Sequence, residues 1–90
     1  MMNKILKLEW SDDSWTEYIY WQQEDRKTLK KVNTLIKDIK RNGPMDGIAK
    51  PDPLRYMKGY SRRIDDKNRL VYDVVDSSLW IVACKGHYED

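Results

Sequence analysis

The chain has 90 residues, of which 40% are hydrophobic and 36% are charged, and its net charge is +2. This length and composition fit a single domain, residues 1–90, with a modest core, and they exclude a largely disordered chain. No apolar run approaches the roughly 18 residues of a membrane span, and the N-terminal segment lacks the apolar core of a secretory signal, so we expect a cytoplasmic protein with no membrane partner.

The first predicted elements are a strand over residues 4–10 and a helix that follows it. Residues 4–10 are rich in large apolar side chains in imperfect alternation, which favours a strand. Ser11 is a good helix N-cap, and Asp12 and Asp13 place negative charge in the first turn, where the helix dipole favours it. Four side chains then fall on one helical face: Trp15, Tyr18, Ile19 and Gln22.

A second helix is predicted to open at Glu24 and Asp25 and to stop at residues 42–44, which read Asn-Gly-Pro. Its apolar stripe consists of Leu29, Val32, Leu35, Ile36 and Ile39. Residues 25–41 also carry seven lysine or arginine residues against two acids. A solvated face opposite an apolar stripe explains this charge, and contact with phosphate is an added use of it.

The second half of the chain is predicted to form a loop and then a series of strands. Residues 42–53 are rich in glycine and proline, so we expect a loop there. Beyond it the hydrophobic period becomes alternating, which predicts strands near residues 55–58, 60–64, 69–74 and 79–84. The order β-α-α-β-β-β-β predicts an α+β fold, in which two consecutive helices pack on one face of a mostly antiparallel sheet.

Three arginines on these strands are candidates for binding an anion. Arg62 and Arg63 are adjacent on a strand and therefore point to opposite faces, so at least one should lie near other groups on a sheet face. A surface ion pair is the alternative. Arg69 begins an otherwise apolar strand, where it either keeps a sheet edge soluble or presents a planar donor fork to phosphate.

The C-terminal strand carries the only cysteine and leads to the only histidine. A lone cysteine excludes an internal disulfide, and we interpret Cys84 as a packing residue, with a thiol nucleophile as the alternative. We expect no metal site, because one thiol and one imidazole supply too few ligands. His87 is either an exposed terminal residue or an acid-base group, and the residues alone favour the first interpretation.

Five segments of the sequence together resemble a known family. They are LEWSDDSWTEYIYW, KPDPL, YSRRI, NRLVY and VACKGHY, in this order. The series is similar to the YoeB branch of the RelE/ParE toxin superfamily from residue 8 to residue 88. The resemblance implies a RelE-like fold and a toxin of a type II toxin-antitoxin system. It also implies a ribosome-dependent endoribonuclease that cleaves messenger RNA in the A site, without metal or cofactor, by attack of the ribose 2′-OH on the adjacent phosphate.

The resemblance also assigns roles to individual residues. Asp52 matches the general base, Arg69 the group that stabilises phosphorane charge, His87 the general acid, and Tyr88 the aromatic that stacks on or orients a base. The RNA-binding positions it implies are Lys50, Arg55, Arg62 and Arg63. The partners it implies are messenger RNA, the ribosome with its ribosomal RNA, a YefM-like antitoxin and a second copy of the chain.

The sequence departs from the family pattern at three places. Asp52 stands where the family has glutamate, residues 54–61 are about two residues shorter than their counterpart, and Glu89 and Asp90 extend past the terminal aromatic. Two other functions therefore stay open: an attenuated inhibitor that binds the ribosome without cleaving, and a ParE-like gyrase inhibitor. The set of Arg69, His87 and Tyr88 favours cleavage, because a binding protein needs no terminal acid-base group.

Overall fold

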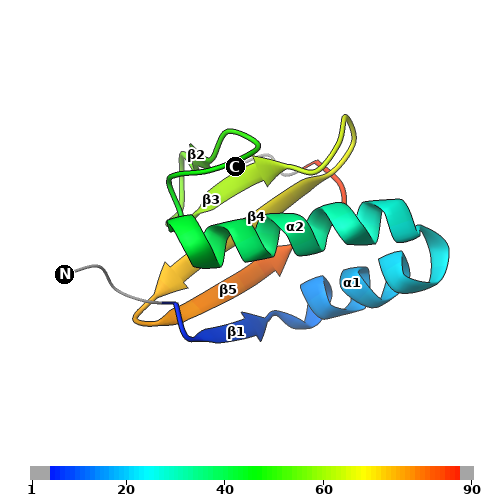
Figure 1. Ribbon diagram of the computed structural model, residues 1–90, viewed down its shortest axis with the longest axis horizontal. Coiled ribbons are helices and arrows are strands. Elements are labelled where there is room, and N and C mark those ends of the chain that lie inside the picture. The colour runs from blue at the N-terminus through cyan, green and yellow to red at the C-terminus, as the bar shows by residue number, and fades with distance from the viewer. Residues whose placement is uncertain (1–4, 88–90) are drawn as a thin grey trace.

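Two helices pack on one face of a five-stranded sheet in the computed structural model, which describes residues 5–87 (Figure 1). The helices are α1 (Asp12–Glu24) and α2 (Arg26–Asn42). The strands are β1 (Lys7–Trp10), β2 (Asp52–Pro53), β3 (Tyr60–Arg63), β4 (Arg69–Val75) and β5 (Ser78–Ala83). This arrangement confirms the predicted α+β fold with two consecutive helices on a mostly antiparallel sheet.

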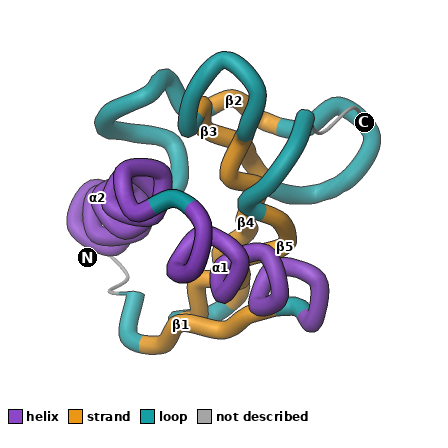
Figure 2. Tube along the Cα trace, turned by 90° about the vertical axis from the view of Figure 1, so that its right-hand side faces the viewer, coloured by secondary structure: helices purple, strands orange, loops and turns teal. Residues whose placement is uncertain are grey.

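The sheet order, β1-β5-β4-β3-β2, places the last strand inside the sheet. β5 pairs with β1 in parallel and with β4 antiparallel, and the remaining pairs are antiparallel. Figure 2, turned by 90° from Figure 1, shows both helices on one side of the strands and the long loops gathered at one end. The chain that leaves β5 therefore runs beside the beginning of β4, where Arg69 lies.

α1 begins directly after the predicted N-cap Ser11. α2 begins at Arg26, after Asp25, whereas Glu24, which was predicted to open the second helix, is the last residue of α1. The Ser11 side chain accepts a hydrogen bond from the Ser14 amide, as an N-cap does. Asp25 ends α1 and also caps α2, since its carboxylate accepts hydrogen bonds from both the amide and the hydroxyl of Thr28. The hydrogen bond from the Thr28 amide is the main reason that the pKa of Asp25 is lowered.

The core lies between the α2 stripe and the inner face of the sheet. Its buried residues include Val32, Leu35, Ile36 and Ile39 from α2, and Leu70, Tyr72, Leu79 and Ile81 from β4 and β5. α1 buries none of the four side chains that share one face in the sequence analysis. Its buried side chains are Ser14 and Trp21, whereas Trp15 and Gln22 are exposed.

The prediction of a strand over residues 55–58 is wrong, because these residues form bends. The strand that precedes β3 is instead the short β2, whose Asp52 and Pro53 pair with Ser61 and Tyr60. A chain that reverses between two antiparallel strands needs residues for the turn, and residues 54–59 supply it. The Leu54 amide closes this connection with a hydrogen bond to the Gly59 carbonyl.

Candidate active site

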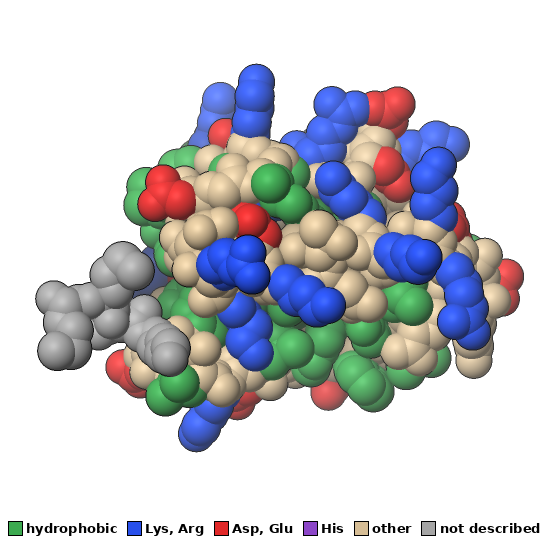
Figure 3. Space-filling model, viewed as in Figure 1, with side chains coloured by type: hydrophobic (Ala, Val, Ile, Leu, Met, Phe, Trp, Pro, Cys, Tyr) green, Lys and Arg blue, Asp and Glu red, His purple; other side chains and the backbone are tan. Residues whose placement is uncertain are grey.

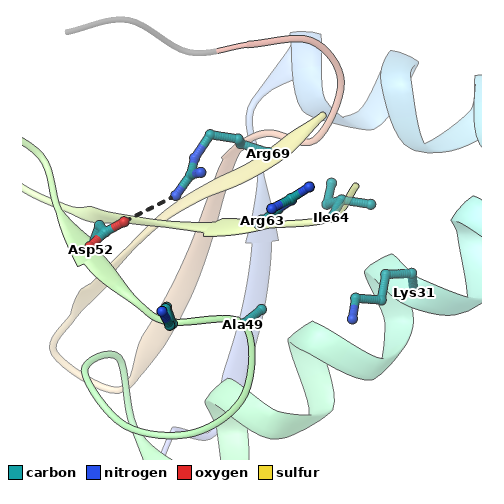
Figure 4. Close-up of a pocket in the computed structure, with 7 residues that line it drawn as sticks. Lys31, Ala49, Asp52, Arg63, Ile64 and Arg69 are labelled. Carbon is teal, nitrogen blue, oxygen red and sulfur yellow. Dashed lines mark hydrogen bonds and ion pairs between the residues drawn. The ribbon is translucent and has the colours of Figure 1, made fainter. Parts of the chain in front are cut away.

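A cleft of about 470 Å³ lies between α2, the loop before β2 and the outer ends of β3 and β4 (Figure 4). Its lining residues are Lys31, Ala49, Lys50, Asp52, Arg63, Ile64 and Arg69. Four of these side chains are cations and one is a carboxylate. The structure thus brings together Lys50, Asp52, Arg63 and Arg69, which the sequence analysis selected from three separate segments.

Arg69 is held in a fixed orientation at the start of β4. Its Nε and Nη2 donate to the Ser61 hydroxyl at 3.1 and 3.0 Å, and Nη2 also donates to Oδ2 of Asp52 at 3.3 Å. The Arg69 side chain is 23% exposed and that of Asp52 is 68% exposed. An ion pair this open to solvent is weak, so an incoming anion can replace the carboxylate at the guanidinium.

Arg63 stands directly opposite Arg69 on the neighbouring strand. Like charges at opposed positions of a sheet destabilise it, unless other groups compensate for them. Two carboxylates compensate in part for this repulsion: Asp66 forms an ion pair with Arg63, and Asp52 forms one with Arg69. Two arginines with replaceable carboxylate partners therefore face the same opening.

Ser61 and Lys31 belong to the site and were not identified as site residues from the sequence. Ser61 is buried, and its hydroxyl orients the Arg69 guanidinium. The role of Ser61 can be recognised only from the strand register. The register pairs Ser61 with Val71 and Arg63 with Arg69, so Ser61 and Arg69 lie on the same face of the sheet. Lys31 projects from α2 toward the cleft (Figure 4). It is one of seven basic residues in the segment 25–41, and nothing in the sequence distinguishes it from the other six.

Arg62 does not share the exposed position of Arg63. Its side chain is fully buried and forms an ion pair of 2.6 Å with Asp38, whose side chain is 15% exposed. Burial alone would raise the pKa of Asp38, but the hydrogen bond and charge of Arg62, with a bond from the Ile48 amide, hold that pKa below its ordinary value. Arg62 was expected to contact RNA, but its side chain lies inside the fold.

His87 is exposed, and the segment that carries it is attached to the turn before β4. The Gly86 amide donates to the Asn68 side chain at 2.7 Å, and the Gly86 carbonyl accepts from the Arg69 amide at 3.0 Å. Nε2 of His87 lies 3.1 Å from the Asp66 carbonyl oxygen. His87 thus sits beside the strand start of Arg69, although it is not part of the cleft lining. Tyr88 lies outside the described residues.

Polar groups of α1 hold the other side of this C-terminal segment. β1 ends opposite Ile81, so the backbone beyond that point has no strand partner on this side. The Ser11 hydroxyl donates to the Val82 carbonyl, Glu17 accepts from the Cys84 amide, and the Trp21 indole donates to the Cys84 carbonyl. Together with the hydrogen bond from the Ser14 hydroxyl to the Ile81 carbonyl, these contacts account for the burial of Ser14 and Trp21.

Two other predictions concern Cys84 and Arg55. Cys84 is buried, and burial raises the pKa of its thiol to about 12, which fits a packing residue and not a nucleophile. Arg55 is exposed on the connection between β2 and β3, outside the cleft lining.

Metal-binding clusters and membrane-spanning helices are both absent from residues 5–87. These residues contain no group of three or more His, Cys, Asp or Glu side chains that could hold a metal ion. Neither of their two helices is long and apolar enough to cross a membrane.

Comparison with known proteins gives one consistent result. Residues 10–88 match the family model of the YoeB-like toxin of bacterial type II toxin-antitoxin systems. The chain is 51% identical to toxin YoeB of Escherichia coli K12 over 92% of its length and 100% of the relative. It is 45% identical to the YoeB dimer from Staphylococcus aureus, with a TM-score of 0.87 over 93% of this chain and 99% of that one. In the YoeB-YefM complex from the same organism the toxin is 44% identical, with a TM-score of 0.86, and the match covers 92% and 98% of the two chains.

Proposed function

Because the chain belongs to the YoeB-like toxins of bacterial type II toxin-antitoxin systems, we propose that it is a ribosome-dependent endoribonuclease that cleaves messenger RNA in the A site. One observation carries this proposal: the Asp52 carboxylate lies among the cations that line a cleft, and it forms an ion pair with one of them, Arg69. A carboxylate beside an oriented guanidinium can take a proton from a hydroxyl and stabilise the phosphate that this hydroxyl attacks.

The proposed reaction uses three side chains and no metal. The phosphate of the scissile bond displaces Asp52 from the Arg69 guanidinium, whose fork suits two phosphate oxygens. Asp52 then takes the proton of the ribose 2′-OH as its oxygen attacks the phosphorus. The bond to the 5′ oxygen breaks, and His87 gives that oxygen a proton. The products are a 2′,3′-cyclic phosphate and a free 5′-OH.

The other cations of the cleft would hold the flanking nucleotides. Lys31, Lys50 and Arg63 line the same opening and can neutralise neighbouring phosphates, which steers a polyanion into the cleft. Arg55, which is exposed near β2, would contact RNA farther from the scissile bond. Tyr88 would stack on or orient an unpaired base next to His87.

The proposed partners follow from the relatives. The toxins from S. aureus are described as a dimer and as a complex with YefM. We expect this chain to dimerise and to bind a YefM-like antitoxin in the same way. An acidic, flexible segment of such an antitoxin would suit the cationic cleft and would order on binding. The cytoplasm, where translating ribosomes are found, is the compartment that this function requires.

The proposal is tested by adding the purified protein to a translation reaction and mapping new RNA 5′ ends. We expect cuts in phase with codons in ribosome-bound message. His87→Gln and Arg69→Ala should each lower the cleavage rate by about a hundredfold or more, because they remove the acid and the group that stabilises phosphorane charge. Lys58→Ala is the control, since Lys58 is exposed on the connection to β3 and lies outside the cleft.

Other outcomes would point to the alternatives. Translation arrest with intact message would contradict cleavage and favour an inhibitor that occupies the ribosome, which the shorter side chain of Asp52 makes the second candidate. Inhibition of DNA supercoiling by gyrase, with translation unaffected, would favour the ParE-like function.

A further inference from the structure

Arg62 is a fully buried cation that lies outside the cleft lining. We propose that Arg62 is a positioning residue, which holds the loop of residues 43–50 in the shape that presents Lys50 and Asp52 to the cleft. The inference rests on the proposed function for its catalytic consequence, but the contacts that carry it concern the loop itself.

Every N–H group of the Arg62 side chain has a hydrogen-bond acceptor. A guanidinium offers five such donors in a rigid plane. The five acceptors, at 2.6 to 3.0 Å, are the Tyr72 hydroxyl, the Asp38 carboxylate and the carbonyl oxygens of Gly43, Asp46 and Ile48. Three of the five are loop carbonyls, so one side chain fixes the loop at three points.

The two side-chain partners of Arg62 hold the same loop. The Tyr72 hydroxyl donates to the Pro44 carbonyl at 2.7 Å, and Asp38 accepts from the Ile48 amide at 3.1 Å. Tyr72 comes from β4 and Asp38 from α2, so the loop is tied through Arg62 to the sheet and to a helix together. No strand or helix forms within residues 43–50 to provide this support.

The backbone of the loop needs support, because it is strained where it meets the cleft. Ala49 and Lys50 have φ values of 61° and 44°, in the left-handed region that residues with a Cβ rarely adopt. Gly47 has φ 113°, and a Cβ at that position would clash with the Asp38 carboxylate. The strained residues directly follow the part of the loop that Arg62 holds, and Lys50 is itself one of them.

Stability alone gives a weak reason for this buried charge. The desolvation of a buried ion pair offsets much of its attraction, and apolar pairs of similar volume often fold as well. Lysine could balance the charge of Asp38 but has only three donors and no fork, so it could not make the same set of bonds. An arginine is specifically needed where several carbonyl oxygens must be held in a defined arrangement.

The test compares Arg62→Met/Asp38→Asn with the wild-type chain. This double variant removes both buried charges, so no unpaired charge is left inside, and the introduced amide oxygen can still accept from the Ile48 amide. We measure amide hydrogen exchange across residues 46–50 and steady-state cleavage rates at several concentrations of programmed ribosomes. We expect faster exchange in the loop and a kcat lowered by about tenfold or more, since displacements of about 1 Å have such effects, with KM changed by less than about threefold.

Two further variants separate positioning from a general loss of stability. Leu79→Ala, in the β5 core, should lower the thermal midpoint without faster exchange in the loop or a lower kcat at a temperature where it is folded. Gly47→Ala keeps the Arg62 residue, but its Cβ would crowd the Asp38 carboxylate and the Arg62 guanidinium at a strained φ of 113°. Its loop exchange and kcat should therefore follow those of the double variant. It also serves if the double variant does not fold.

The inference is overturned if the folded double variant, or Gly47→Ala, keeps wild-type loop exchange, or if it cleaves with the wild-type kcat. It is also overturned if Leu79→Ala loses as much kcat as they do, because the loss would then reflect stability. A wild-type chain that does not cleave would contradict the proposed function, and loop exchange would still decide whether Arg62 holds the loop.

Discussion

Arg63 and Arg69 face each other across two strands, and each has a carboxylate partner that solvent reaches. Such exposed pairs contribute little to stability, whereas the repulsion between opposed arginines remains. A phosphate between the two arginines would relieve that repulsion and release Asp52 at the same time. The arrangement thus couples binding of the substrate anion to the freeing of the proposed base.

This coupling predicts opposite effects of Asp52→Asn on binding and on cleavage. The amide cannot accept the 2′-OH proton, so the single-turnover cleavage rate should fall by about a hundredfold or more. Affinity for ribosomes should stay equal or rise, because the variant loses a negative charge beside the RNA. Asp52→Glu should keep cleavage within about tenfold of the wild type, since the carboxylate is kept and exposed side chains can readjust. Undiminished cleavage by Asp52→Asn would rule out Asp52 as the base.

At the scale of elements, α2 has one face in the core and one face dominated by cations. The sole acid of the helix, Asp38, turns inward to Arg62, so it neutralises none of the exposed lysines. Figure 3 shows lysine and arginine side chains over the face of the molecule on which α2 lies. Lys31 lines the cleft and also the neighbouring hollow, where Lys27 lies with Asp25 and Asp65, so the exposed lysines of α2 reach the edge of the proposed active site.

The exposed lysines of α2 should therefore contribute to RNA affinity by neutralising phosphates. We predict that Lys27→Gln/Lys30→Gln/Lys37→Gln weakens ribosome binding and flattens its dependence on salt. In a plot of log affinity against log salt, the slope should drop by about 0.7 to 0.9 for each phosphate that the variant no longer neutralises. Binding is measured by filtration at several salt concentrations, with Lys58→Gln as the single-charge control. An unchanged slope would exclude this face from the RNA interface.

Both helices could be predicted from local signals, but their packing could not. The caps Ser11 and Asp25 and the apolar period of α2 act within a few residues of sequence. The buried face of α1 depends on the backbone at and just after the end of β5, where Val82 and Cys84 have Ser11, Glu17 and Trp21 as hydrogen-bond partners. The short β2 was missed for a related reason: a two-residue strand has no hydrophobic period, and only its pairing with β3 defines it.

At the scale of the whole molecule, the candidate site is assembled from separate parts of the chain. Lys31 comes from α2, Lys50 from the loop, Arg63 and Arg69 from two strands, and His87 from the segment after β5. The family resemblance selected all of these positions except Lys31, and the register explains how the two arginines meet. The separate register of β4 with β5 includes an irregularity between Val71 and Tyr72, which no period in the sequence indicates.

Whole-molecule stability should depend on pH through Asp38. Its native pKa lies below the ordinary value of 3.8, so below that pH the unfolded chain binds a proton that the native chain does not. Its contribution to the free energy of unfolding is therefore complete above that range and is lost as pH falls through the native pKa. Thermal unfolding between about pH 6 and pH 2.5, approximately the range where carboxylates titrate, should show a shallower acid loss in Asp38→Asn. Identical slopes would contradict this assignment.

The most direct test of the central claim replaces one 2′-OH of the message by hydrogen. Ribosomes are programmed with RNA that carries a single 2′-deoxy nucleotide immediately before the scissile phosphate, and cleavage is followed in a single turnover. The account predicts that cleavage at this site disappears, while the all-ribose message is cut to a 2′,3′-cyclic phosphate and a 5′-OH. Cleavage of the deoxy message at the same bond would show that another nucleophile attacks the phosphate, and it would contradict the proposed mechanism.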